Sequence, residues 1–328
     1  MPVSEFTVRP YADGDESAIL DLFARSFPHA PRALAHFDWK YRRNPFGTRR
    51  ISLAFDANDN LVAHYAGYPV PFFAYGKDVL AQQIGDTMTD VAIRHIGRGP
   101  TSILGRTALD FYERFCEEKI AFNFGFNVAN IQKFSLRFLR SDRVEPVTYR
   151  VASPLPRLKR SERWLRGYSL EEVRATDAEW DELFMRARDA YKFCVRRDAA
   201  YVRWRYLDCP DVPYHVVAVR KWRRLVAWIV FRIREDRFTW GDALVHPEFP
   251  DAIEVALRHI VPSHSVRIIE AWYPPRPRFF DDTLTALGFA TQPEPQDLSL
   301  MCVPFVWKNV VASMRDDLFY SWGDGDLF

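Results

Sequence analysis

The sequence predicts a mixed α/β fold of the α+β kind, in which one domain plan is used twice along the chain. The chain has 328 residues, which is about twice the length of a typical domain of roughly 150 residues. One short sequence pattern occurs in both halves, and in each half it lies between an amphipathic helix and a β-hairpin. We therefore expect two tandem domains, each a mostly antiparallel sheet with flanking helices.

The composition supports two folded domains and excludes several other classes of protein. Hydrophobic residues make up 48% of the chain and aromatic residues 15%, which is enough for two sizeable cores. The 45 Lys and Arg residues nearly balance the 43 Asp and Glu residues, so we expect no nucleic-acid or membrane partner. The apolar runs are too short to span a bilayer, and residues 1–6 do not resemble a signal peptide.

The cysteines favour a reduced compartment. They lie far apart and form no CxxC pair, so the sequence predicts neither a disulfide framework nor a metal site. We therefore expect a cytoplasmic protein. The four residues are Cys116, Cys194, Cys209 and Cys302.

The repeated pattern is W-x-Y-x-x-x-P, which begins at Trp39 and again at Trp204, 165 residues later. A Leu-Val-Ala triplet follows each copy, at Leu61 and at Leu225, with an offset of 164 residues. Two matches in the same order are hard to explain by chance, so they indicate a duplication. We expect Trp39, Tyr41, Trp204 and Tyr206 to be packing residues, with an acceptor cleft as the alternative.

The periodicity places similar elements in the two halves. In the first half we expect strands at 6–10, 50–55, 61–67, 82–89 and 120–126, and helices around 19–23, 103–115 and 130–139. In the second half we expect strands at 168–170, 214–219, 225–231 and 238–245 and a helix around 180–187. The predicted boundaries are a first domain at 1–152, a basic linker at 153–167, a second domain at 168–306 and a tail at 307–328.

A glycine loop follows the fourth strand of the first half. Gly97 and Gly99 lie just before a predicted helix, whose N-terminal N–H groups and partial positive charge favour a phosphate. Arg94 and Arg98 would add positive charge, whereas Pro100 removes one N–H donor. The alternative is that the glycines only form a turn. The Walker A and dinucleotide-binding motifs are both absent.

These residues resemble the GNAT superfamily of acyl-CoA N-acyltransferases. The run from Arg94 to Gly99 fits the family pattern Q/R-x-x-G-x-G/A between a strand and a helix, and a second register that loses the Arg is also open. The resemblance implies a pair of splayed central strands, with coenzyme A lying between them. The second half resembles a degenerate copy without the glycine loop, which implies a single active site.

The resemblance also implies the residues of an acetyl-CoA site. Asn130 is expected at a helix N-cap, with a ligand contact as the alternative. The predicted cofactor-binding residues are Met88, Thr89, Val91, Arg94, Gly97, Arg98, Gly99, Thr101, Ser102 and Asn130.

Catalysis needs a base for the amine proton and an acid for the departing thiolate. The family's usual tyrosine acid is absent from the helix at 130–139. Asp86 and Asp90 are the candidate bases, directly or through water, although either could instead bind loop backbone. His95 has a useful pKa near neutrality and lies beside the predicted phosphate loop.

The implied function is N-acetyl transfer from acetyl-CoA to the primary amine of a small molecule, such as an amino sugar or an amino-acid derivative. The alternatives are an aminoacyl or acyl transferase of the cell-wall type and a non-catalytic acyl-CoA-binding protein. We expect a monomer or a homodimer. The tail should fold back over one domain, where Asp324 or Asp326 would attract an amine.

Overall fold

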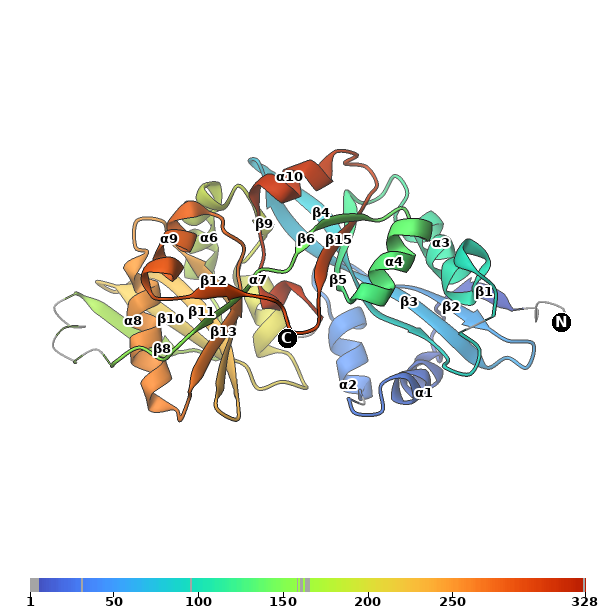
Figure 1. The fold of residues 1–328 in the computed structure, drawn as a ribbon, viewed down its shortest axis with the longest axis horizontal. Coiled ribbons are helices and arrows are strands. Elements are labelled where there is room, and N and C mark those ends of the chain that lie inside the picture. Colours follow the sequence, from blue (N-terminus) through green and yellow to red (C-terminus); the bar gives the residue numbers. More distant parts are fainter. Residues whose placement is uncertain are drawn as a thin grey trace. The chain divides into compact units, whose positions relative to one another are not determined.

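The computed structural model describes residues 6–30, 32–94, 96–157, 159, 162, 166–326 and 328, which form two compact units (Figure 1). Unit 1 comprises Met1–Pro71, Val79–Pro146 and Leu298–Ala312. Unit 2 comprises Phe72–Asp78, Val147–Asp297 and Ser313–Phe328. No helix in the described part of the chain is long and apolar enough to cross a membrane.

Unit 1 contains a mixed sheet with the strand order β1-β2-β3-β4-β5-β15-β6. Most neighbouring strands are antiparallel, and β4 and β5 are the parallel pair at its centre. The strands are β1 (Thr7–Pro10), β2 (Arg50–Phe55), β3 (Leu61–Ala74), β4 (Lys77–Thr89), β5 (Phe122–Asn127), β6 (Asp142–Pro146) and β15 (Ser299–Pro304).

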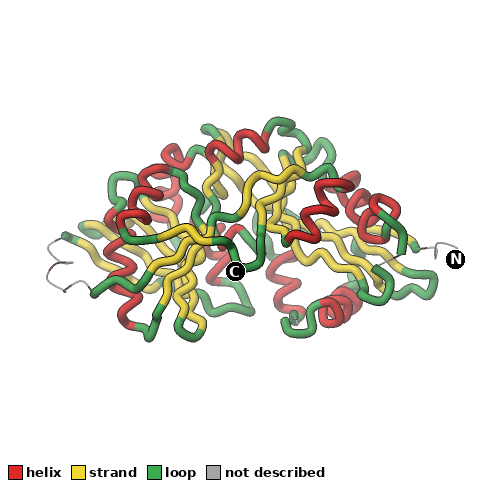
Figure 2. The backbone as a smooth tube through the Cα atoms, viewed as in Figure 1, coloured by secondary structure: helices red, strands yellow, loops and turns green. Residues whose placement is uncertain are grey.

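Helices cover both faces of this sheet (Figures 1 and 2). The first pair, α1 and α2, lies on one side of β3 and β4, and the second pair, α3 and α4, lies on the other. The α3 face is apolar at helical spacing, so Ala108, Phe111 and Tyr112 pack on Tyr65 of β3. The helices are α1 (Glu16–Ser26), α2 (Leu34–Phe37), the π-helical turn η1 (Asp38–Arg42), the 3-10 turn η2 (Gly99–Thr101), α3 (Ile103–Phe115) and α4 (Ala129–Phe138).

Unit 2 repeats this plan around a sheet with the order β14-β7-β13-β12-β11-β10-β8. The strands of this sheet are β7 (Tyr149–Ala152), β8 (Tyr168–Glu172), β10 (His215–Lys221), β11 (Arg224–Arg234), β12 (Arg237–Val245), β13 (Ile268–Trp272) and β14 (Ala290–Gln292). Two short strands of unit 2 lie outside it: β9 (Phe193–Val195) pairs with the end of β3 at Phe72–Ala74, and β16 (Leu318–Phe319) pairs with β9. Its helices are α6 (Ala178–Tyr191), α7 (Ala199–Val202), η3 (Arg203–Leu207), α8 (Asp251–Ile260), η4 (Val261–Ser263), α9 (Arg278–Ala286) and η5 (Trp322–Asp324), and α10 (Val310–Asp317) enters it from unit 1.

The two halves of the chain exchange a strand, so the units depart from the predicted boundaries of 1–152 and 168–306. Strand β15, late in the sequence, pairs with both β5 and β6 in unit 1 (Figure 1). Strand β7, from the end of the first half, pairs with β13 and β14 in unit 2. A strand's residue pattern shows which face it buries but not which sheet it joins, so the sequence alone does not show the exchange.

The same contacts in the two units support the predicted duplication. The repeated motif forms a π-helical turn in each, and its Trp39 and Trp204 are both buried. The backbone N–H of Asp90 donates to Val62 O at 2.8 Å in unit 1. The N–H of His246 donates to Val226 O at 2.8 Å in unit 2, which gives the same strand register.

The C-terminal tail folds back onto unit 2. Strands β12 and β13 pair in parallel as far as Trp240 and Ala271 and then separate. Trp322 of the tail stacks on Trp272, directly after the last pair of β13, with ring centroids 4.8 Å apart. The ring of Phe328 lies so close to Gly241, directly after the last pair of β12, that a Cβ there would be 1.7 Å from it. The tail therefore contacts both strands where they diverge.

Asp324 of the tail is not available to attract an amine. It is buried, and its carboxylate accepts a hydrogen bond from Arg197 at 2.5 Å. Arg197 also donates to Asp242 of β12 at 2.8 Å, so the three side chains form a buried ionic cluster inside unit 2. The expectation for Asp324 is therefore wrong, because the charge of this residue is already neutralised within the fold.

Replacing Phe328 by Ala should lower the free energy of unfolding by about 3 kcal/mol, because it removes a buried ring from the diverging strands. Urea denaturation followed by tryptophan fluorescence measures the change. Trp222→Ala is the control, since this ring is 71% exposed and its loss should change stability by less than about 0.5 kcal/mol. Equal small effects in both variants would show that the tail does not stabilise unit 2.

Candidate active site

The centre of unit 1 is an opening between two parallel strands. Strands β4 and β5 pair only at Gln82 with Asn123 and at Gln83 with Phe124, and then they diverge. This confirms the predicted splayed pair. Backbone N–H and C=O groups beyond the last pair no longer have the neighbouring strand as a partner, so an extended ligand can use them.

A small cavity of about 30 Å³ lies beside this opening, on the side of α3 and α4. Ile84 of β4 and Gly125 of β5 line it, and a Cβ on Gly125 would be only 3.3 Å from Ile84 O. The other lining residues include Tyr65, Tyr112, Asn127 and Ser135.

The glycine loop has a conformation that requires glycine. Gly97 has φ 75° and Gly99 has φ 53°, in the left-handed region that disfavours other residues. A Cβ on Gly99 would lie 2.6 Å from the ring of Phe138 in α4. The loop is therefore held against α4 and leads directly into the N-terminus of α3 (Figure 1).

Two hydroxyl groups of the loop stabilise the loop itself. Ser102 is the N-cap of α3, and its Oγ accepts from Gly105 N at 3.0 Å and donates to Gly99 O at 2.6 Å. Thr101 Oγ1 donates to Arg98 O at 2.9 Å. These contacts shape a helix N-terminus that carries partial positive charge.

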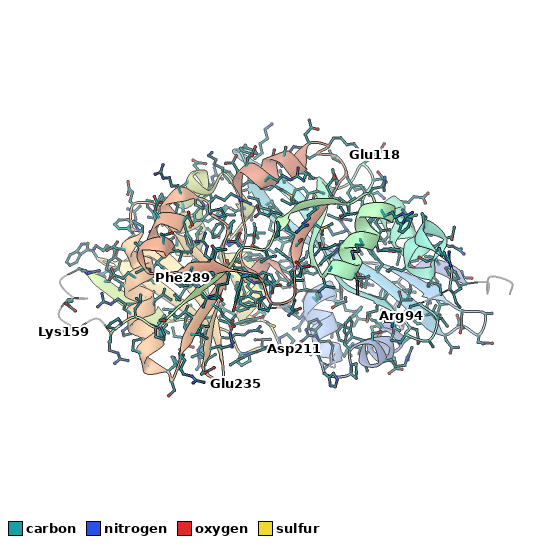
Figure 3. All side chains as sticks on the ribbon, in the orientation of Figure 1. Arg94, Glu118, Lys159, Asp211, Glu235 and Phe289 are labelled. Carbon is teal, nitrogen blue, oxygen red and sulfur yellow. The ribbon has the colours of Figure 1, made fainter. Side chains whose placement is uncertain are left out.

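The predicted basic residues of the loop lie on the surface. Arg94 and Arg98 are both exposed, and Arg94 is labelled in Figure 3. An anion bound at the start of α3 would gain from both charges without either being buried. His95 lies outside the described residues.

The remaining predicted cofactor residues lie on β4, on the turn that follows it and on α4. Met88 is buried, Thr89 is half-buried and Val91 is 54% exposed. Asn130 is exposed in the first turn of α4. The N-cap of α4 is Val128, so the prediction that Asn130 is the cap is wrong. Strand β5 continues to Asn127, and the helix therefore starts immediately after one extended residue.

Asp86 is partly buried and makes an ionic contact. Its carboxylate accepts hydrogen bonds from Lys40 Nζ at 2.8 Å and from Tyr41 Oη at 2.7 Å. Burial alone would raise the pKa of Asp86, but the positive charges of Lys40 and His36 and these hydrogen bonds hold it well below its ordinary value. A carboxylate that binds protons so weakly is a poor base.

The same hydrogen bond occurs in unit 2, where Tyr206 Oη donates to Asp242 at 2.6 Å. Tyr41 and Tyr206 occupy equivalent positions of the repeated motif. Because unit 2 lacks the glycine loop, the shared Tyr–Asp contact favours a structural role for Asp86. It also supports the packing role expected for the motif aromatics.

Asp90 binds the turn after β4. Its Oδ1 accepts from Ala92 N at 3.0 Å, and its Oδ2 lies 3.3 Å from Arg25 Nε. The side chain therefore makes the backbone contact that the sequence analysis gives as its alternative role.

His64 is a residue of this site that the sequence analysis does not single out. It lies on β3 with 0% of its surface exposed, and its Nδ1 is 2.7 Å from Asp86 O. A second cavity of about 10 Å³ lies beside it, under α1 and α2, and is also lined by Phe23, Tyr41 and Met88. A polar residue in an otherwise apolar strand is the signal that could have identified it.

Two tyrosines from unexpected elements line the larger cavity. Tyr65 Oη of β3 and Tyr112 Oη of α3 are 3.0 Å apart. Burial raises the pKa of both hydroxyl groups, so they stay protonated at neutral pH. The expected position on α4 holds Ser135 instead, so the tyrosine hydroxyls that reach this space come from β3 and α3.

A family model described as an acetyltransferase (GNAT) domain matches residues 7–136. This segment is therefore similar to GNAT acetyltransferase domains. The match covers the splayed strands and the glycine loop of unit 1, and it supports the predicted class of acyl-CoA-dependent N-acyltransferase. No curated protein matches the sequence of the whole chain.

Solved structures share the fold over nearly the whole chain. An Enterococcus faecalis protein described as a probable N-acyltransferase matches with TM-score 0.70 and 13% identity over 93% of this chain and 74% of its own. A GCN5-related N-acetyltransferase from Kribbella flavida matches with TM-score 0.64 and 14% identity over 92% of this chain and 71% of its own. Saccharomyces cerevisiae N-myristoyltransferase with bound myristoyl-CoA matches with TM-score 0.57 and 12% identity over 92% of this chain and 83% of its own. The fold of this chain is therefore shared with these N-acyltransferase structures.

Replacing Asp86 by Asn should lower the free energy of unfolding at pH 7 by about 3 kcal/mol, because the ammonium of Lys40, 2% exposed, loses its carboxylate partner. Asp59→Asn, in an exposed hairpin turn, is the matched control and should have almost no effect. Urea denaturation of both variants measures the difference.

The difference in unfolding free energy between wild type and Asp86→Asn should also depend on pH. The pKa of Asp86 is lower in the folded state, so its stabilisation is present above the unfolded pKa of about 3.9 and is lost as pH falls towards the folded pKa. The gap between wild type and Asp86→Asn should therefore shrink below about pH 4. A gap that stays constant down to pH 2 would contradict the ionic role.

Proposed function

We propose that this chain transfers the acetyl group of acetyl-CoA to the primary amine of a small molecule, such as an amino sugar or an amino-acid derivative. The observation that carries the proposal is the divergence of β4 from β5 beside a left-handed glycine loop at the N-terminus of α3. The divergence suits an extended pantetheine, and the helix N-terminus suits its phosphates.

The proposed donor site follows the chain from β4 to α4. The pantetheine would run along Met88, Thr89 and Val91, where a backbone N–H would polarise the thioester carbonyl. The phosphates would lie on the loop, close to the two exposed arginines. The residues proposed for the loop and its surroundings are Arg94, Gly97, Arg98, Gly99, Thr101, Ser102 and Asn130.

The proposed donor carries a short acyl group. The yeast neighbour N-myristoyltransferase binds myristoyl-CoA, whose acyl chain is much longer.

Unit 2 would contribute no second donor site. Its tail already contacts the diverging ends of β12 and β13, and the segment from Val245 to Asp251 contains no glycine. We therefore propose one active site per chain, in unit 1. The balanced charge and the separated cysteines support a cytoplasmic enzyme without a nucleic-acid or membrane partner. We propose that it acts as a monomer or homodimer.

Calorimetric titration with acetyl-CoA tests the donor site. Arg98→Glu should weaken binding at least about tenfold, because it places a negative charge beside the phosphates. Arg278→Glu, at an exposed position in unit 2, is the matched control and should bind like wild type. Substituting Gly97 is a less specific test, because a Cβ there would be 2.7 Å from Thr101 O and would distort the loop by itself.

The outcomes separate the alternatives. Absence of binding to wild type would mean that the glycine loop is only a turn, and the chain would be a scaffold or would use another donor. Binding without amine-dependent release of coenzyme A thiol would identify a non-catalytic acyl-CoA-binding protein. Tighter binding of myristoyl-CoA than of acetyl-CoA would contradict the short acyl group.

A further inference from the structure

The two units allow equivalent residues to be compared within one chain. The shared register aligns β3 and β4 with β11 and β12, so Asp86 is equivalent to Asp242 and His64 to Trp228. The Tyr–Asp hydrogen bond is present in both units and serves the fold. His64 differs from its counterpart, and it belongs to the unit that has the glycine loop.

The equivalent space is filled in unit 2. Trp228 is completely buried and packs on Trp180 of α6, with ring centroids 5.8 Å apart. In unit 1 the smaller His64 leaves the cavity of about 10 Å³ beneath α1 and α2. Replacing a large packing residue by histidine therefore creates space and places a titratable group in it.

The hydrogen bond of His64 defines its tautomer. A carbonyl oxygen can only accept, so the contact of 2.7 Å requires that Nδ1 donates to Asp86 O. The neutral ring then carries its lone pair on Nε2. This atom is buried and has no hydrogen-bond partner among the described residues. A buried acceptor without a hydrogen-bond partner lowers the stability of the fold. Nε2 is therefore suited to a ligand that donates a hydrogen bond to it.

The charge around His64 favours a neutral base that can be protonated during the reaction. Burial lowers the pKa of His64, the Asp86 charge partly offsets this, and Lys40 lowers it further. His36, Arg32 and the Tyr41 hydroxyl also line the cavity. The ring is therefore unprotonated at neutral pH, and the Asp86 carboxylate would stabilise an imidazolium.

We propose that His64 Nε2 is the general base of unit 1, which accepts a proton from the acceptor amine directly or through one water molecule. This rests on the proposed function. As the amine nitrogen bonds to the acetyl carbon and the C–S bond breaks, the nitrogen loses one proton to Nε2. The imidazolium returns this proton to solvent, and solvent protonates the departing thiolate.

His64→Asn is the most informative variant. The Asn amide can still donate to Asp86 O in place of Nδ1, but the variant has no atom in place of the basic Nε2. Thiol release with acetyl-CoA and a panel of ethanolamine, glucosamine and glycine ethyl ester as probe amines should fall about 100-fold or more. Calorimetric affinity for acetyl-CoA should stay within about threefold of wild type, because no residue of the phosphate loop lines the cavity beside His64.

The pH profile distinguishes a base from a structural residue. Below the pKa of His64, the wild-type kcat/KM should fall through loss of both the free amine and the free imidazole. In His64→Asn it should fall with the amine alone. His64→Gln should behave in the same way, which provides a second variant if Asn unfolds the chain. His246→Asn is the control, since this histidine is also buried but lies in unit 2, and it should keep wild-type activity.

A direct measurement separates this inference from the proposed function. The ¹⁵N chemical shifts of His64 in the wild-type protein should show a protonated Nδ1 and an unprotonated Nε2, whether or not any amine is turned over. A protonated Nε2 at pH 7, or a folded His64→Asn that retains activity within about threefold, would overturn the role of His64. Failure of wild type to bind acetyl-CoA would overturn the proposed function instead.

Discussion

The separation of two parallel strands in each sheet is the constraint on which the rest of the molecule depends. Each pair makes only a few cross-strand pairs before the strands diverge, and the backbone beyond that point needs other partners. Unit 2 places its own tail there, with Trp322 on Trp272 and Phe328 on Gly241. Unit 1 has a cavity at the same place and a glycine loop at the start of the next helix. In unit 2 the protein's own tail therefore covers the diverging strands. In unit 1 the diverging strands suit a ligand.

Strand exchange makes the two halves of the chain depend on each other for folding. Strand β15 lies between β5 and β6, and β7 lies between β13 and β14. Without these insertions each sheet would end in an exposed edge beside an unpaired strand. The degenerate half therefore contributes to the first unit by completing its sheet, although it has no glycine loop of its own.

Comparison of equivalent residues in the two units also distinguishes structural residues from candidate catalytic residues. The contact between Tyr41 and Asp86 is matched by Tyr206 and Asp242, so its burial and charge serve packing in both units. His64 and its counterpart Trp228 have different roles, since one leaves a cavity and the other fills the equivalent space. The Asp86 carboxylate is therefore a weaker candidate for chemistry than His64, which has one nitrogen in a hydrogen bond and the other without a partner among the described residues.

The sequence by itself determined the duplicated α+β plan, the main helices and strands, the glycine loop and the resemblance to GNAT enzymes. These features depend on local periodicity and on residues with special backbone freedom, which a single segment reveals. Only the tertiary structure decided the exchange of β7 and β15, the position of Asn130 inside α4, the ionic contact of Asp86 and the buried environment of His64. Each of these depends on which distant segments meet, and neither the period of a pattern nor the identity of one side chain specifies that.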